Sequence, residues 1–295
     1  MAVTIKDFAV GRKTFFITPD LSLFPENYLE EFFALGFESY FVENLKTISL
    51  EEQCEAIISV FNDVILFFNI DANVPGINWF NFIKDLQERH PDLFIGVMFV
   101  KRPDREVKTR LEKLFNYDLG IKCGCVQLEY QKNANFWIIQ KILFANQAQG
   151  RRKTIRALCT GAYTFSFIHN GQSVDGALQD ISLSHFSFIY PKDKMQINSY
   201  EKIDNIHFHL KGLLIRSNAV LIMQRPIGED DVLNVFAFLD DNGMNGLTER
   251  YKQLLMPNIY DLMSSNYKSL MAKVYQSRKQ ENKEHSDVED LEINL

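Results

Sequence analysis

The sequence predicts a two-domain protein in which an α/β domain with a doubly wound parallel sheet precedes a small antiparallel β-barrel with a C-terminal helix. The chain has 295 residues, which is more than one average domain. Strand-like and helical segments alternate five times over residues 14–145, a pattern typical of a parallel sheet covered by helices. From Arg156 to Asp240, short segments alternate apolar and polar residues, which is typical of antiparallel strands.

The first domain, residues 1–147, contains five apolar segments with the length of β-strands. The third is apolar except for Asn69, as expected for a strand that is buried on both faces. The segments between the strands carry apolar residues at helical spacing. The expected strands are Thr14–Ile17, Glu38–Val42, Val64–Ile70, Phe94–Val100 and Ile121–Leu128. The expected helices are Glu26–Leu35, Leu50–Phe61, Trp79–Arg89, Arg105–Phe115 and Asn135–Ala145.

The second domain, residues 158–276, combines the barrel with a helix that closes it. Asn170-Gly171 lies between two strand-like segments, and this dipeptide favours a two-residue hairpin turn. The apolar spacing becomes helical from Leu247 to Val274. Pro257 lies inside that segment, and we expect it to break the helix and restart it.

Two charged segments flank the second domain. Residues 148–157 form a linker with the densest basic cluster of the chain, four cations in the six residues from Arg151 to Arg156. The tail, residues 277–295, holds three basic and six acidic residues. It has too few apolar residues to pack firmly, so we expect it to be disordered.

The composition excludes several classes of protein. A net charge of −6 argues against a broad surface for nucleic acid polymers. No apolar stretch approaches the roughly 20 residues that span a bilayer. The N-terminus lacks the apolar region of a secretion signal, and four cysteines do not make a disulfide scaffold. We therefore expect a cytoplasmic protein without a membrane span.

Two short motifs lie at the start of the barrel. The first is the basic segment Arg151-Arg152-Lys153-Thr154-Ile155-Arg156, and the second is Asp180-Ile181-Ser182. Each is weak alone, because a basic segment between domains is usually a solvated linker and Asp-x-Ser usually forms a turn.

In this order and on this architecture, the two motifs resemble those of the PilZ domain. That family has an Arg-x-x-x-Arg motif before a six-stranded barrel and an Asp/Asn-x-Ser-x-x-Gly motif on it. Arg152 and Arg156 match the first motif, with Arg151 as an extra basic neighbour, and Asp180 and Ser182 match the second. The resemblance covers nearly half of the chain. It implies a receptor for the bacterial second messenger cyclic di-GMP.

The matching residue types suit this ligand, which carries two anionic phosphates and two guanines. A guanidinium can place two donors on a phosphate or on guanine O6 and N7. The Asp180 carboxylate can accept from the amino and imino edge of guanine, and the Ser182 hydroxyl can donate to phosphate or base. His185 stands where the family has glycine. It either blocks the ligand or adds a stacking or hydrogen-bonding contact to guanine.

The first domain has a resemblance of its own, to the receiver domain of response regulators. Asp71-Ala72-Asn73-Val74-Pro75-Gly76 follows the third expected strand, where receivers place a phospho-accepting aspartate before a Met-Pro-Gly-like turn. Asp71 is the acceptor position. Receivers also carry two acids after the first strand, whereas this chain has only Asp20 there. The sequence therefore predicts a receiver-like fold without reliable phosphorylation.

These observations favour a non-enzymatic bacterial effector that binds cyclic di-GMP through Arg151, Arg152, Arg156, Asp180, Ser182 and His185. Binding at the linker and barrel would rearrange the domains and control an unidentified protein partner. Two alternatives stay open: a phosphorylation-driven response regulator that uses Asp71, and a ligand-free interaction scaffold. No metal site and no cofactor are expected. The sequence also leaves open the oligomeric state and the number of nucleotides bound.

Overall fold

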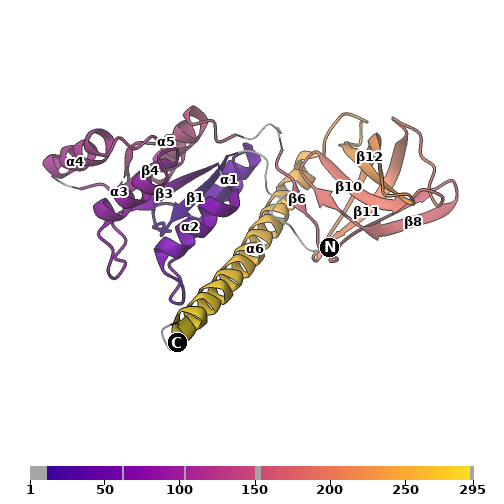
Figure 1. Cartoon of the computed structure of the whole chain (residues 1–295). Coiled ribbons are helices and arrows are strands. Elements are labelled where there is room, and N and C mark those ends of the chain that lie inside the picture. Colours follow the sequence, from indigo (N-terminus) through magenta and orange to yellow (C-terminus); the bar gives the residue numbers. More distant parts are fainter. Residues whose placement is uncertain (1–11, 62, 103, 150–153, 293–295) are drawn as a thin grey trace. The chain divides into compact units, whose positions relative to one another are not determined.

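A computed structural model describes residues 12–61, 63–102, 104–149 and 154–292 (Figure 1). The chain forms two compact units. Thr154–Tyr267 makes up the barrel unit, whereas the α/β unit combines the described parts of Thr4–Lys153 and Lys268–Leu295. No helix in the described residues has the length and apolar content that crossing a membrane requires.

The α/β unit holds a five-stranded parallel sheet with the order β2-β1-β3-β4-β5. This is the flavodoxin-like doubly wound order, so the predicted fold class of the first domain is confirmed. The strands are β1 (Lys13–Ile17), β2 (Ser39–Val42), β3 (Val64–Asn69), β4 (Phe94–Val100) and β5 (Cys125–Leu128). The helices are α1 (Asn27–Ala34), α2 (Leu50–Phe61), α3 (Trp79–Arg89), α4 (Arg105–Glu112), the π-helical η2 (Lys113–Asp118) and α5 (Lys132–Ala145).

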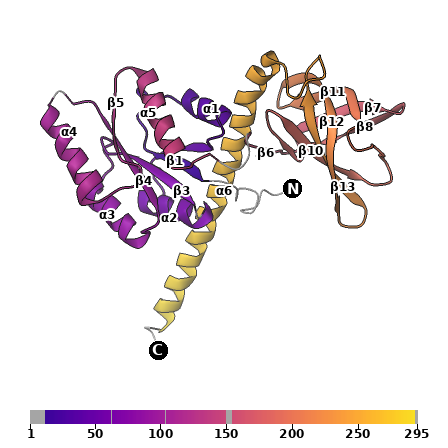
Figure 2. The same ribbon diagram turned by 90° about the horizontal axis from the view of Figure 1, so that it is seen from above.

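Helices cover both faces of this sheet because successive residues of a strand point to opposite faces. Phe16 of β1 stacks on Phe32 of α1, which in turn stacks on Phe136 of α5 at 4.8 Å between ring centroids. The preceding residue, Phe15, contacts Phe61 of α2 at 5.3 Å. Helices α1 and α5 therefore share one face and α2 covers the other (Figure 2).

The barrel unit is an antiparallel sheet with the order β6-β9-β10-β13-β12-β11-β7-β8. Six strands of six residues or more carry it, and two strands of two residues extend one edge. The long strands are β7 (Tyr163–His169), β8 (Gln172–Ala177), β10 (His185–Pro191), β11 (Lys202–Leu210), β12 (Leu213–Ile227) and β13 (Asp231–Leu239). The short strands are β6 (Ala157–Leu158) and β9 (Asp180–Ile181).

The sheet curls so strongly that strands which are not neighbours share one core (Figure 2). Phe165 of β7 and Phe188 of β10 are not on adjacent strands, yet their ring centroids lie 4.0 Å apart. Asn170 and Gly171 both have positive φ angles, 50° and 76°, as the predicted two-residue hairpin turn requires. The predicted antiparallel barrel is therefore confirmed as a curled sheet.

Helix α6 (Glu249–Glu292) is continuous, which differs from the sequence prediction at two points. Pro257 does not interrupt it, although proline in a helix costs about 3 kcal/mol. Its neighbours Leu255 and Ile259 are fully buried, and this burial offsets the loss.

The tail that the sequence predicted to be disordered is also helical, up to Glu292. The segment from Ser277 to Glu292 contains no glycine or proline and many Lys, Glu and Gln residues, which favour a helix. Arg278 also donates to the Ser59 hydroxyl of α2 at 2.6 Å, within the α/β unit.

Candidate ligand-binding site

Arg156 and Asp180 are brought together by the two shortest strands. Ala157 pairs with Ile181 and Leu158 with Asp180, so β6 carries the preceding Arg156 alongside β9. The Nη1 atom of Arg156 lies 3.8 Å from Oδ1 of Asp180. The two side chains are 27% and 15% exposed. Residue 157, which the prediction placed in the linker, thus belongs to the sheet.

The Asp180 carboxylate has an unused acceptor. Its Oδ1 atom is buried and accepts no hydrogen bond from any residue that the structure describes. A separation of 3.8 Å is too long for a hydrogen bond to Arg156. A buried polar atom without a partner typically costs about 1–3 kcal/mol. This atom is therefore well placed to accept a hydrogen bond from a bound molecule.

The Ser182 hydroxyl is occupied by hydrogen bonds within the protein. It is fully buried, and its hydroxyl accepts from the backbone N–H groups of Ser184 and His185 at 3.3 and 3.0 Å. The same hydroxyl donates to the carbonyl of His185 at 3.1 Å. Ser182 thus closes the turn between β9 and β10, and in this arrangement it shapes the site rather than presenting its hydroxyl to a ligand.

His185 opens β10 and is anchored by a chain of hydroxyl groups. Its Nδ1 atom lies 2.7 Å from Ser184 Oγ, which lies 2.7 Å from Thr154 Oγ1. Thr154 belongs to the basic segment, and this series of hydrogen bonds connects Thr154 to the β9–β10 turn. Burial, and secondly the positive charge of Arg156, lower the pKa of His185, while Asp180 opposes the shift. The imidazole is therefore held in its neutral form at neutral pH.

The backbone at residue 185 does not need a glycine. His185 is absent from the described residues with positive φ, so an L side chain is tolerated there without strain. The remaining reason for a glycine is the close approach of a ligand. Arg151 and Arg152, the other predicted arginines, lie outside the described residues.

Asp71, the position that resembles a phospho-acceptor, is already bound on both carboxylate oxygens. Its Oδ2 accepts from the backbone N–H of Val100 at 2.6 Å, and its Oδ1 pairs with the Arg102 guanidinium. The Asp20 carboxylate accepts from the N–H and hydroxyl of Ser22. The described residues contain no group of three His, Cys, Asp or Glu side chains that could hold a metal ion.

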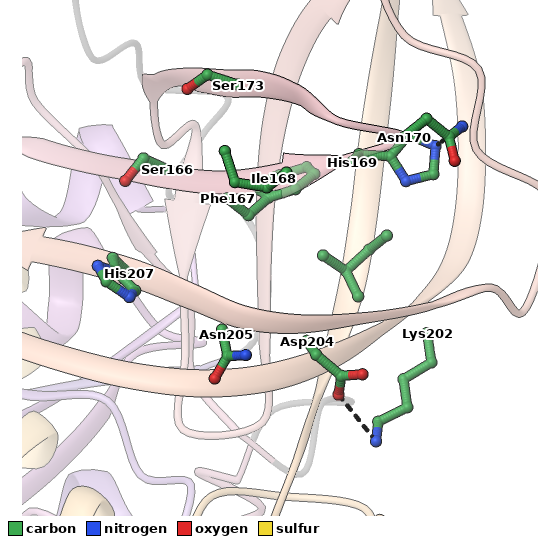
Figure 3. Close-up of a pocket in the computed structure, with 11 residues that line it drawn as sticks. Ser166, Phe167, Ile168, His169, Asn170, Ser173, Lys202, Asp204, Asn205 and His207 are labelled. Carbon is green, nitrogen blue, oxygen red and sulfur yellow. Dashed lines mark hydrogen bonds and ion pairs between the residues drawn. The ribbon is translucent and has the colours of Figure 1, made fainter.

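A separate hollow of about 590 Å³ lies between β7 and β11 (Figure 3). Pairing of these strands ends at Ser166 and His207, because a β-bulge between Ile203 and Ile206 turns β11 away. Asn205 in the bulge has a φ of 55°, and its N–H donates to the Asn218 side chain. None of the predicted site residues lines this hollow.

No protein-family model and no curated protein matches the sequence. Among solved structures, the chain is similar to the PilZ domain of YcgR from Escherichia coli with c-di-GMP, at 16% identity and a TM-score of 0.34. That match covers 41% of this chain and 97% of the other. Full YcgR in complex with c-di-GMP gives 14% identity, a TM-score of 0.30 and coverage of 44% of this chain.

The Bacillus subtilis inhibitor of motility, MotI/DgrA, matches at 15% identity with a TM-score of 0.30, over 37% of this chain. The matches span about half the length of YcgR and of MotI/DgrA, 50% and 49%. At such TM-scores, the function has to be argued from the residues of the chain itself.

Proposed function

We propose that this chain is a PilZ-type effector that binds cyclic di-GMP beside Arg156 and Asp180 and transmits the binding to a protein partner. The observation that carries the proposal is the buried, unsatisfied Oδ1 atom of Asp180, which lies 3.8 Å from a guanidinium nitrogen. An acceptor and a forked donor side by side match the donor and acceptor edges of guanine.

Cyclic di-GMP has hydrogen-bond donors for the Asp180 carboxylate and acceptors for the Arg156 guanidinium. The guanine N1–H and amino groups are donors that can reach Asp180, while guanine O6 and N7 or a phosphate can accept from Arg156. Arg151 and Arg152 add positive charge for the two phosphates. This basic cluster is local within a chain of net charge −6, which suits a small dianion better than a long polyanion.

The proposed roles of the other site residues follow from their contacts. Ser182 holds the β9–β10 turn on which the site rests. His185, neutral and half-buried, borders the site and offers its ring for stacking on a guanine. Binding at the linker and the barrel then rearranges the domains, and this rearrangement controls the partner protein. The proposed role is that of a receptor, without a catalytic step.

The proposal is tested by titration calorimetry of the full chain with cyclic di-GMP. We expect binding in the micromolar range or tighter, and a loss of about tenfold or more in Arg152→Ala, Arg156→Ala and Asp180→Ala, since each removes contacts to a charged or forked partner. Arg225→Ala is the matched control, because Arg225 is exposed on β12.

Absence of binding by the native chain overturns the proposal, as does equal binding by Asp180→Ala and Arg225→Ala. If His185→Gly restores binding that the native chain lacks, the ligand-free scaffold becomes the better description.

A further inference from the structure

Helix α6 is hydrogen-bonded to the barrel through two asparagine side chains. Asn266 Nδ2 donates to the carbonyl of Leu158 at 2.8 Å, and Asn258 Nδ2 donates to the carbonyl of Leu210 at 3.2 Å. Eight residues separate them, a little more than two helical turns, so their directions from the helix axis differ by about 80°. One carbonyl belongs to β6 and the other to the end of β11.

Asn266 lies on the buried side of the helix. It is 5% exposed, and its helical neighbours Leu262, Met263 and Tyr267 are also buried. A buried amide that finds no partner destabilises the fold, so an asparagine here is favourable only while Leu158 accepts its hydrogen bond. The position could otherwise be filled by leucine, which has the same number and branching of side-chain heavy atoms but no polar group.

Leu158 also belongs to the candidate ligand site. It pairs with Asp180 across the β6–β9 ladder and lies two residues after Arg156. Strand β6 has only two residues and is an edge strand of the sheet. So short a strand has few interactions to hold it, apart from β9 and the bond from Cys159 N–H to the Gln179 carbonyl at 3.0 Å.

We propose that Asn266 is a positioning residue of this site, and that helix α6 senses whether the site is occupied. The second half of this inference rests on the proposed function. A ligand that binds Arg156 and Asp180 holds β6 in the place where Leu158 meets Asn266. By linkage, docking of the helix and binding of the ligand then strengthen each other by the same factor.

The first experiment needs no ligand. Hydrogen exchange of the full chain is compared for Asn266→Leu and Asn258→Leu, with Asn266→Ala as a second variant in case the leucine misfolds. We expect faster exchange at Leu158 and Cys159 in the Asn266 variants only, since Asn258 binds a carbonyl of β11 and not one of β6. Unchanged exchange at these amides in a folded Asn266 variant overturns the positioning role.

The second experiment adds cyclic di-GMP. We expect the Asn266 variants to bind roughly tenfold more weakly than the native chain and Asn258→Leu to bind within about twofold. The nucleotide should also slow exchange around Asn266 in the native chain and lose this effect in the variants. Equal affinities of the two leucine variants, with the native chain binding normally, contradict the sensing role.

The two ideas fail in different ways. If the native chain does not bind cyclic di-GMP, both the proposed function and the sensing role are wrong. The exchange rate at Leu158 still decides whether Asn266 positions β6. If the native chain binds and both asparagine variants behave alike, only the inference about α6 falls.

Discussion

The guanidinium of Arg156 and the carboxylate of Asp180 form an ion pair that is not a hydrogen bond, with Nη1 and Oδ1 3.8 Å apart. Both residues adjoin the two-residue pairing of β6 with β9. Their side chains are partly exposed, so solvent screens the attraction and the pair adds little stability by itself. The buried Oδ1 atom therefore remains an unsatisfied acceptor beside a guanidinium.

Arg156→Lys is expected to bind cyclic di-GMP about tenfold or more weakly than the native chain, almost as weakly as Arg156→Ala. Lysine keeps the charge, but it lacks the planar pair of donors. Titration calorimetry at fixed salt measures the difference, with Arg225→Lys as control. Full binding by Arg156→Lys would mean that this residue contributes charge alone.

The barrel is expected to lose stability as the pH is lowered, and part of this loss is expected to depend on His185. Burial lowers the pKa of His185 in the folded chain below its ordinary value of about 6.5. Above that ordinary value, both states are neutral and the shift has no effect. As the pH falls below it, the unfolded chain binds a proton that the folded chain resists, so folding becomes less favourable.

Urea unfolding at pH 7.5 and 5.0 tests this for the native chain and His185→Gln. The native chain should lose more stability between the two pH values than the variant, which lacks the titrating ring. Equal losses would show that the histidine is not desolvated enough to affect folding.

Gly96→Ala is expected to destabilise the α/β unit by about 1–3 kcal/mol, as overpacking of a core does. Gly96 on β4 pairs with Phe67 on β3, and a Cβ atom at residue 96 would overlap the Phe67 ring. Urea unfolding measures the loss. Phe67→Leu should recover part of it in the double variant, and Gly161→Ala, where nothing lies within 4 Å, should be nearly neutral.

Acetyl phosphate is not expected to label Asp71. The Val100 N–H and Arg102 already bind its two oxygens, and Asp20 is engaged by Ser22. Mass spectrometry of the treated chain and of Asp71→Asn checks this. Labelling that disappears in Asp71→Asn would contradict the prediction and favour the response-regulator alternative.

For several elements, the first and last residues were predicted correctly from the pattern of apolar residues. Helices Leu50–Phe61 and Trp79–Arg89 and strand Phe94–Val100 have the expected bounds. The fifth strand starts at Cys125 instead of Ile121, because Gly124 adopts a φ of 77°, which is outside the extended region and interrupts the regular strand. Ile121 and Cys123 before it are buried, and the Cys123 N–H still donates to the Ile95 carbonyl of β4 at 2.9 Å, so hydropathy alone does not mark where the regular strand begins.

The candidate site was predictable only where it follows a short motif. Arg156 and Asp180 were named because their motifs resemble those of the PilZ domain, and the structure brings them together. Thr154 and Ser184 lie beside those motifs, yet their hydrogen bond depends on how the turn closes. Asn266 is 108 residues from Leu158, so its role arises from tertiary packing that has no local signal.

The α/β unit is split along the chain, since the segment from Lys268 is separated from Thr4–Lys153 by the whole barrel. During synthesis, more than a hundred residues leave the ribosome between these two parts, which takes on the order of ten seconds at about 5–20 residues per second. Throughout that interval the Ser59 hydroxyl of α2 lacks the hydrogen bond that Arg278 donates in the full chain. A nascent chain therefore contains all of the barrel unit before it contains the last segment of the α/β unit, although synthesis of the α/β sheet came first.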